Sequence, residues 1–343
     1  MTVIAIVLAG ILITAIAVIA LMVVYGTTAS PQPFAPIGSA MAGVSTRDLP
    51  PLQRFTARDG QELTYRAYET DGTRAAILIH GQAMDGVTLH RAAGALAKAG
   101  MSAFVPTIRG HGQDGRPGDI DYAGQLDDDL ADFLTHLRET RPETDFSLAG
   151  HSAGGGFVIR IAQSALSGLF ERFVLLAPML DSASPIFRPE SGKWARPHVR
   201  RIVGLMLLDA FGIHRFEGLP ILAFGVPAKS STHFVPSYSY RLQKNFSAPD
   251  DYARKLGSIL QPIALIAGEK DEILASDSYG SLLLPYRSDI SIHIIPNAGH
   301  MGVVLAPEAL AALTETLGEG NLPATGPVEF ETLQAEATEP AGS

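Results

Sequence analysis

The sequence predicts an α/β protein built on a mostly parallel, doubly wound sheet that helices cover on both faces. Two observations support this class. Short apolar runs alternate with helical stretches of about 10–15 residues along most of the chain, which is typical of successive βαβ units. The apolar run 146–149 leads into the glycine-flanked turn Gly150-His151-Ser152-Ala153-Gly154 and then into a helix. Ligands bind such sheets at the carboxyl ends of the strands, and Ser152 lies at one of these ends.

The individual elements follow in the order that this class requires. Strand-like runs at 52–57 and 62–68 are joined through Arg58-Asp59-Gly60, and its Asp-Gly pair predicts a hairpin at an antiparallel edge of the sheet. The alternating part then comprises strands at 75–79, 102–105, 146–149 and 173–176, with helices at 87–99, 125–138 and 157–165. After an interruption it resumes with strands at 263–267 and 291–295, a helical stretch from Ala275 and a last helix at 307–317.

The interruption, residues 178–261, is predicted to be a cap. It is rich in prolines and aromatics, contains the only tryptophan, Trp194, and includes an apolar helical run at 199–211. An insertion between strands at the catalytic end of a sheet is well placed to cover a site. Basic side chains adjoin the apolar run: Arg188, Lys193, Arg196, Arg200 and Arg201. This pattern fits a solvated cap face, and it also fits contact with anionic lipid or an amphiphilic substrate.

The amino-terminal segment predicts a single-pass membrane anchor over residues 1–25. No charged residue occurs from Val3 to Val24, and roughly 20 apolar residues suffice to cross a bilayer. Such a signal-anchor most simply leaves the catalytic domain outside the cytoplasm. A cleaved signal peptide, cut near Thr28-Ala29-Ser30 or Ala40-Met41-Ala42, is the alternative. The segment lacks the basic start of a signal peptide, and its apolar stretch exceeds the usual 7–15 residues or so.

The remaining regions have low-complexity composition. Residues 26–51 are rich in Pro, Ser, Ala and Gly and predict a linker that holds the domain away from the membrane. Residues 318–343 are rich in Gly, Pro, Glu and Thr and predict a disordered tail. The folded domain is therefore assigned to residues 52–317.

Composition excludes several classes of function. The net charge of −9 comes without a basic stripe, which argues against nucleic acid as a partner. The chain has no cysteine, so disulfides, thiolate metal sites and cysteine nucleophiles are excluded. We expect neither a metal nor an organic cofactor. Hydrophobic residues make up 46% of the chain and charged residues 18%, which fits a chain partly embedded in membrane. The oligomeric state stays open.

Serine is a weak nucleophile at neutral pH, so Ser152 requires a base to accept its proton and an acid to orient that base. His300 follows the last predicted strand directly and is the candidate base. Asp271, after the strand 263–267, is the candidate acid, with Glu269 and Glu272 as near neighbours. The chain order serine, acid, histidine is the one that this architecture imposes. Asp181, after the strand 173–176, is the alternative acid.

Acyl transfer also requires two preorganised N–H donors for the oxyanion, each worth roughly 3 kcal/mol of barrier. The amide of Ala153, directly after the nucleophile, is one candidate. The second is the amide of Gln82, in the loop His80-Gly81-Gln82 that follows the strand 75–79.

Five segments together resemble the α/β-hydrolase superfamily, and in particular its serine aminopeptidase, lysophospholipase and monoacylglycerol lipase-like branch. They are His80-Gly81-Gln82, Arg109-Gly110-His111-Gly112, Gly150-His151-Ser152-Ala153-Gly154, Gly268-Glu269-Lys270-Asp271 and Gly299-His300. The resemblance covers about 52–317. It implies Ser152 as nucleophile, His300 as general base and then acid, Asp271 as the orienting acid, and Gln82 and Ala153 as oxyanion donors.

The resemblance implies a serine hydrolase that cleaves a carboxylic ester, such as a lysophospholipid, a monoacylglycerol or a small ester, through an acyl-enzyme. Amide or peptide cleavage and perhydrolase chemistry use the same triad and are the enzymatic alternatives. A binding protein that keeps the fold without turnover is the alternative from another class. One departure concerns the substrate class: the family often has an aspartate before the Arg-Gly-His-Gly segment, where this chain reads Pro106-Thr107-Ile108.

Overall fold

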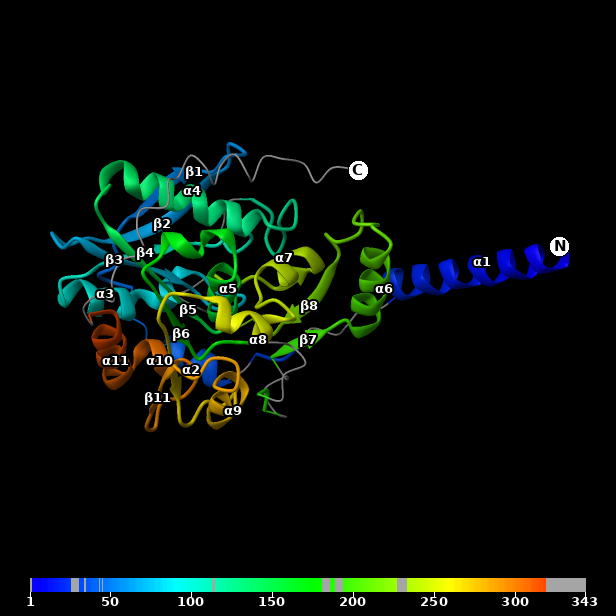
Figure 1. The fold of residues 1–343 in the computed structure, drawn as a ribbon. Helices are drawn as coiled ribbons and strands as arrows, with labels where there is room; N and C mark the ends of the chain where they lie inside the picture. Colours follow the sequence, from blue (N-terminus) through cyan, green and yellow to red (C-terminus); the bar gives the residue numbers. More distant parts are fainter. Residues whose placement is uncertain are drawn as a thin grey trace.

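The computed structural model describes residues 2–25, 31–33, 35–42, 44, 46–112, 115–180, 186–188, 194–226 and 233–318. Helix α1 (Thr2–Val24) stands away from a rounded body that holds the other described elements (Figure 1). The alternative acid Asp181 and the predicted tail beyond residue 318 lie outside the described residues.

The body is organised around an eight-stranded sheet with the order β1-β2-β4-β3-β5-β6-β10-β11. Its strands are β1 (Leu52–Thr56), β2 (Glu62–Tyr68), β3 (Arg74–Ile79), β4 (Ser102–Pro106), β5 (Asp145–His151), β6 (Arg172–Leu176), β10 (Ile263–Gly268) and β11 (Ser291–Ile295). The pairs β1–β2 and β2–β4 are antiparallel, and all other neighbours are parallel. The predicted α/β sheet with an antiparallel hairpin at its edge is confirmed.

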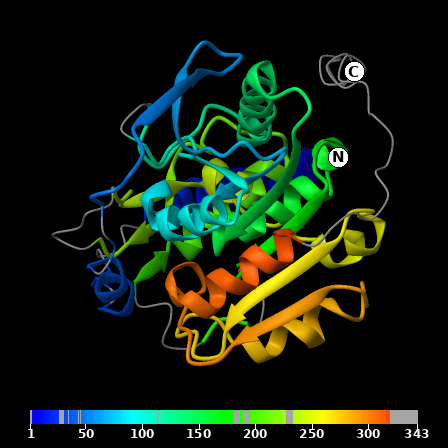
Figure 2. The ribbon, with the colours of Figure 1, turned by 90° about the vertical axis from the view of Figure 1, so that its left-hand side faces the viewer.

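Helices cover both faces of this sheet. The chain passes from β3 to β4 in one direction and from β5 to β6 in the other, and right-handed crossovers then place α3 (His90–Lys98) and α5 (Ala153–Ala162) on opposite faces. Helices α10 (Gly302–Leu305) and α11 (Pro307–Gly318) pack beside α3, as Figure 2 shows for α11. Helix α4 (Gln125–Thr140) is tied to α5 by an ion pair between Asp127 and Arg160 at 2.9 Å.

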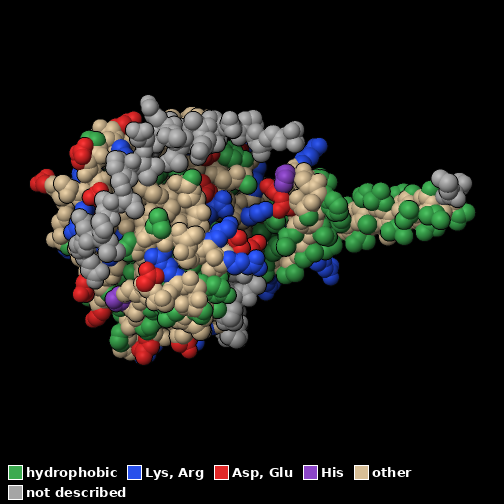
Figure 3. Space-filling view, viewed as in Figure 1, with side chains coloured by type: hydrophobic (Ala, Val, Ile, Leu, Met, Phe, Trp, Pro, Cys, Tyr) green, Lys and Arg blue, Asp and Glu red, His purple; other side chains and the backbone are tan. Residues whose placement is uncertain are grey.

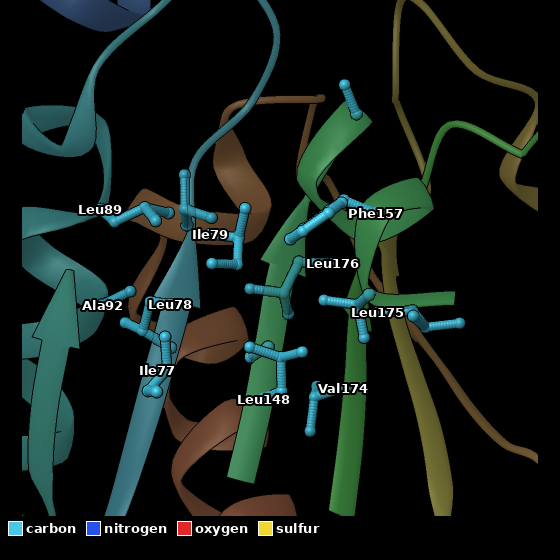
Figure 4. Close-up of a cluster of buried hydrophobic side chains, with 14 of the residues drawn as sticks. Ile77, Leu78, Ile79, Leu89, Ala92, Leu148, Phe157, Val174, Leu175 and Leu176 are labelled. Atoms are coloured by element: carbon cyan, nitrogen blue, oxygen red, sulfur yellow. The ribbon is translucent and has the colours of Figure 1, made fainter. Parts of the chain in front are cut away.

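The core lies where the central strands meet these helices (Figure 4). The central strands carry continuous apolar runs because both faces of a doubly covered sheet are buried. Fully buried side chains come from β3, β5, β6 and α5; they include Ile77, Leu148, Val174 and Phe157. This packing fixes the carboxyl ends of β3, β5 and β10, and the predicted site residues follow these ends directly.

The interruption between β6 and β10 contains a small sheet that the sequence did not predict. The order is β7-β8-β9, with both pairs antiparallel, and the strands are β7 (Ala195–Pro197), β8 (Pro220–Phe224) and β9 (Ser237–Ser239). These strands have only three to five residues, and β7 and β8 include proline, so no alternating pattern could reveal them. The helices here are α6 (Val199–Ala210), α7 (Tyr240–Asn245) and α8 (Tyr252–Lys255), and α6 matches the predicted apolar helical run.

Described residues between α1 and β1 pack against the body, although the sequence predicts a linker that holds the domain away from the membrane. They include α2 (Ala35–Ala42), and both Ile37 and Val44 are buried in the main core. The end of α1 contacts α6, where Val23 packs with Leu205. Gly204 permits this packing, because a Cβ there would lie 2.9 Å from Val23 Cγ2. The remaining helix, α9 (Tyr279–Leu283), lies between β10 and β11 in the chain.

Candidate active site

Ser152 lies at the sharp turn between β5 and α5, with φ 56° and ψ −118°. A positive φ is rare for a residue with a side chain and persists only where the surroundings enforce it. Here the positive φ of Ser152 is enforced by close backbone contacts at two glycines. A Cβ on Gly150 would lie 2.2 Å from the Gly154 oxygen, and a Cβ on Gly154 would lie 2.5 Å from the His80 oxygen. The two glycines are therefore required by close backbone packing, which holds Ser152 at the end of the strand.

Asp271 and His300 form a buried pair at the ends of β10 and β11. His300 Nδ1 donates to Asp271 Oδ2 at 2.8 Å, and Asp271 Oδ1 accepts the N–H groups of Ile273 and Leu274 at 2.8 Å each. Burial by itself raises the pKa of the Asp271 carboxyl, but the facing His300 ring and the two backbone N–H groups more than offset it, so the net pKa lies below the usual value. Asp271 is thus a charged acceptor that fixes the orientation of the His300 ring.

The two glutamates near Asp271 accept backbone N–H groups of the loop that carries His300. Asp271 is the carboxylate that contacts the His300 ring. Glu272 Oε2 accepts the His300 N–H at 2.9 Å, and Glu269 Oε2 accepts the Asn297 N–H at 3.0 Å. The structure therefore separates three neighbouring carboxylates that the sequence could not rank by geometry.

The turn of Ser152 and the loop of His300 contact each other through His151. His151 Nε2 donates to the His300 carbonyl oxygen at 3.1 Å, and the two rings are 4.8 Å apart between centroids. Burial lowers the pKa of His151 to about 3, so its ring is neutral. Among the described residues, no hydrogen bond joins Ser152 Oγ to His300 Nε2. Such bonds are often long before substrate is present and tighten in the reacting complex.

Of the two predicted oxyanion amides, that of Ala153 directly follows Ser152, and that of Gln82 lies in a loop that packs on the turn of Ser152. A Cβ on Gly81 would lie 3.4 Å from Ser152 Cβ, so the loop that carries Gln82 packs directly on the turn. Ala153 is the first residue of α5, and its amide is one of the donors that a helix start leaves without an intrahelical partner. Within the part of the chain that the structure describes, the backbone N–H groups of Gln82 and Ala153 have no hydrogen-bond acceptor.

Cap residues hold the loop that carries Gln82, and the sequence did not predict this. Ala83 adopts φ 63°; its N–H donates to Tyr238 Oη at 2.7 Å, and its carbonyl accepts the Val235 N–H at 2.8 Å. The Gln82 side chain donates to Gln243 Oε1 on α7 at 2.8 Å. No motif marks these cap residues, because their partners are about 150 residues away in the chain.

Two buried histidines complete this arrangement. The Ile108 N–H donates to His80 Nε2 at 3.1 Å, so His80 carries its proton on Nδ1, which faces the Gly81 oxygen. His111 Nδ1 faces the carbonyl oxygens of Ile108 and Arg109, and His111 Nε2 therefore accepts the hydroxyl of Tyr238. Burial lowers the pKa of His80 to about 4 and that of His111 well below its usual value. Both rings are neutral hydrogen-bonding groups.

Arg109 anchors the Arg-Gly-His-Gly segment to Asp129 on α4. Arg109 makes two hydrogen bonds to the Asp129 carboxylate, at 2.8 and 2.7 Å, and an ion pair with Asp59 at 2.9 Å. Neutralisation by two carboxylates explains how Arg109 is tolerated in a buried position. This ion-pair network supports the backbone that His80 and His111 contact.

Among the described residues, the cluster with metal-ligand spacing lies in the cap and not beside Ser152. It comprises Asp209, His214 and Glu217. His214 Nδ1 lies 3.1 Å from Asp209 and 3.0 Å from Glu217, and Lys244 also pairs with Asp209 at 2.6 Å. These groups are paired with one another.

The sheet order and the turn at Ser152 define the fold. Together with the likeness to solved structures, they show that the chain has the α/β-hydrolase fold. Residues 71–219 match the family described as serine aminopeptidase, S33. Comparison with curated protein sequences gives no match.

Three solved structures illustrate the likeness. A soluble variant of monoglyceride lipase from Saccharomyces cerevisiae has 17% identity and a TM-score of 0.61, covering 84% of this chain and 97% of that one. Monoacylglycerol lipase from Paleococcus ferrophilus has 19% identity and a TM-score of 0.55, covering 74% and 98%. A bacterial membrane phospholipase A has 17% identity and a TM-score of 0.54, covering 93% and 97%. At these identities the likeness establishes the fold.

Proposed function

We propose that this chain is a membrane-anchored serine hydrolase that cleaves carboxylic esters through an acyl-enzyme. The observation that carries the proposal is the backbone of Ser152, held at a positive φ in a turn that contacts the loop of the His300–Asp271 pair through His151. Strain of this kind costs on the order of 1–3 kcal/mol and is concentrated at functional sites. A packing role for Ser152 does not explain this backbone strain, because any small residue in an ordinary conformation could fill the turn.

In the proposed reaction, Ser152 Oγ attacks the carbonyl carbon of the ester while His300 Nε2 accepts the hydroxyl proton. The negative charge that develops on the carbonyl oxygen is held by the amides of Gln82 and Ala153. Collapse of this intermediate breaks the ester bond, and His300 returns the proton to the leaving alcohol. Water then attacks the acyl-enzyme by the same route, which releases the carboxylic acid and restores Ser152.

Support for an ester substrate comes from the structural likeness. The yeast and archaeal proteins named above are glyceride lipases, and the bacterial one is a phospholipase. The family match names an aminopeptidase, so peptide amides are the competing substrates. Turnover of a series of p-nitrophenyl esters with increasing acyl length, with aminoacyl amides alongside, discriminates between the two classes.

Membrane anchoring by α1 is the second part of the proposal. Val3–Val24 has a mean hydropathy of 3.1 over its most apolar window, and none of that window is buried within the protein. The 23 residues of α1 span about 34 Å as a helix, which is enough for the roughly 30 Å hydrocarbon core. A fluorophore at Ile11 that stayed in contact with water after reconstitution into vesicles would contradict the anchor.

Covalent labelling tests the assignment of the nucleophile. A fluorophosphonate probe is expected to label the full-length protein at a single peptide, the one that contains Ser152, because only an activated serine reacts with such probes. Ser152→Ala should remove the label completely. Ser281→Ala, at an exposed position on α9, is the matched control and should label as the wild type does. A folded protein that does not label, or that labels elsewhere, refutes the proposed mechanism.

Tyr238→Phe is expected to lower kcat by roughly 10- to 100-fold with little change in KM. Tyr238 holds the N–H of Ala83, next to the oxyanion donor Gln82, and full loss of one such donor costs about 10²–10³-fold. The phenyl ring keeps the packing with Phe224 but leaves the Ala83 N–H without an acceptor. Steady-state kinetics on a soluble ester measure the effect.

Tyr240→Phe is the matched control, because it removes a hydroxyl in the same cap from a residue whose Oη lies 3.5 Å from Asp209 and does not contact the oxyanion loop. It should leave kcat unchanged. An equal loss in both variants would indicate general damage to the cap, and a Tyr238→Phe effect confined to KM would assign Tyr238 to substrate binding.

A further inference from the structure

The outer face of α6 is apolar and exposed. Val199, Val203, Met206 and Leu207 lie on one side of the helix, and their exposed fractions range from 39% to 62%. Phe211, the residue directly after the helix, is 74% exposed on the same side. Residues spaced by three and four positions share a helix face. Five large apolar side chains on one face exceed the single exposed hydrophobics that are normal on soluble surfaces. We call this set the α6 apolar face.

The opposite side of α6 holds the end of the proposed membrane span. Gly204 faces α1 so closely that a Cβ there would lie 2.9 Å from Val23 Cγ2. Arg201 Nε donates to the Val23 carbonyl oxygen at 2.9 Å, and Arg201 Nη1 donates to the Pro220 oxygen at 2.7 Å. The last turn of α1 is thereby attached to the cap through both apolar and polar contacts.

If α1 spans the bilayer as proposed, α6 lies at the end of the span. Figure 1 shows α6 running across the base of α1. In Figure 3 the hydrophobic side chains over α6 are continuous with those on the side of α1. A helix that lies across the base of a spanning helix is parallel to the bilayer plane and at the depth of the head groups.

Charged and aromatic residues border the α6 apolar face in the manner of an interfacial helix. Arg200 is exposed in the first turn of α6, and Arg215 is exposed in the loop after it. Long basic side chains at such positions can reach lipid phosphates while their stems remain among apolar groups. Ile213 and Phe216, both more than 40% exposed, extend the apolar surface beyond the helix.

We propose that the α6 apolar face is a membrane-docking surface, which inserts into the head-group region of the leaflet where α1 ends. The inference rests on the proposed insertion of α1 and goes beyond anchoring: the cap itself lies on the bilayer. We assign lipid as the partner of the α6 apolar face because this face adjoins the end of α1. When α1 spans a bilayer, lipid surrounds its end and therefore also reaches α6. The segment that clamps the oxyanion loop belongs to the same cap, so lipid contact and the hydrolytic site meet in one structural unit.

Site-specific fluorescence tests this docking, and the natural absence of cysteine makes single-cysteine labelling clean. The environment-sensitive fluorophore NBD is attached to full-length Met206→Cys and Phe211→Cys. Ile11→Cys in α1 and Ile294→Cys on β11, an exposed apolar position distant from α6 in Figure 1, serve as controls. Each protein is reconstituted into nanodiscs of phosphatidylcholine and phosphatidylglycerol with one copy per disc. Quenching by a lipid nitroxide near the head group is compared with quenching by aqueous iodide.

Docking predicts that the labels at 206 and 211 lose fluorescence to the lipid nitroxide and are protected from iodide, whereas the label at 294 shows the reverse. Labels at 206 and 211 that behave like the label at 294, while the label at 11 reports lipid, would overturn docking and leave the anchor intact. If the label at 11 is also in water, the anchor fails and docking fails with it. Protection that appears only with two copies per disc would instead assign the face to a second copy of the chain. Probe labelling of Ser152 is scored separately, so the hydrolase proposal stands or falls independently.

Discussion

Asp271→Asn is expected to lower kcat by about 10⁴-fold. The asparagine can still accept the N–H groups of Ile273 and Leu274 through its oxygen, which leaves its NH₂ group facing His300 Nδ1. A donor at that position favours the tautomer with the proton on Nε2, and that tautomer cannot accept the proton of Ser152. Loss of the orienting carboxylate in a serine triad has an effect of this order.

Steady-state turnover of a p-nitrophenyl ester measures this loss, with a thermal unfolding scan to establish folding. Glu272→Gln is the matched control, because it removes one charge from the adjacent residue and retains an acceptor for the His300 N–H. We expect a much smaller loss from it. An Asp271→Asn enzyme that is less affected than Asp181→Asn would transfer the role of the acid to Asp181.

Lowering the pH from 6.5 to 4.5 is expected to destabilise the folded protein strongly. Three histidines near the site, His80, His111 and His151, are fully buried and neutral, because burial lowers each pKa. The unfolded chain binds protons at these histidines near pH 6.5, whereas the folded chain does not until about pH 4 for His80 and about 3 for His151. Their contribution to stability is therefore complete above pH 6.5 and is lost as the pH falls through this window.

The size of the acid effect follows from the number of groups. Each buried neutral histidine costs about 1.4 kcal/mol per pH unit within the window, and domains are stable by only about 5–15 kcal/mol in total. Urea unfolding in detergent at several pH values measures the slope. His151→Gln should reduce it by roughly one third of the three-histidine contribution. His293→Asn, at an exposed position, should not change it. Equal slopes in all three proteins would show that the buried histidines do not govern acid stability.

The elements of the sheet and the nucleophile turn could be predicted because their signals are local. Apolar strands and amphipathic helices follow from residue periodicity, and the predicted strand at 75–79 differs from β3 by one residue. The cap sheet could not be predicted, since β7 and β9 have three residues each and depend on pairing with β8. Pairing between distant segments leaves no periodic trace in a short strand.

The order of residues along the chain predicts which serine, acid and histidine form the candidate site, but it does not predict the directions of their side chains. Ser152, Asp271 and His300 were selected from their positions after successive strands, and the structure places Asp271 and His300 in contact. Order did not distinguish Asp271 from Glu272, because both follow the same strand. Only the direction of each side chain decided which carboxylate faces the imidazole ring and which one binds the backbone.

The sequence by itself determined the fold class, the strained position of Ser152 and an apolar segment long enough to span a bilayer. Each of these depends on residues that are close together in the chain, where backbone geometry and side-chain spacing are set by the local pattern. The tertiary structure alone decided that Tyr238 and Val235 clamp the loop of Gln82, and that α6 turns one apolar face outward at the base of α1. These features depend on contacts between segments about 150 or more residues apart, so they exist only once the core has brought those segments together.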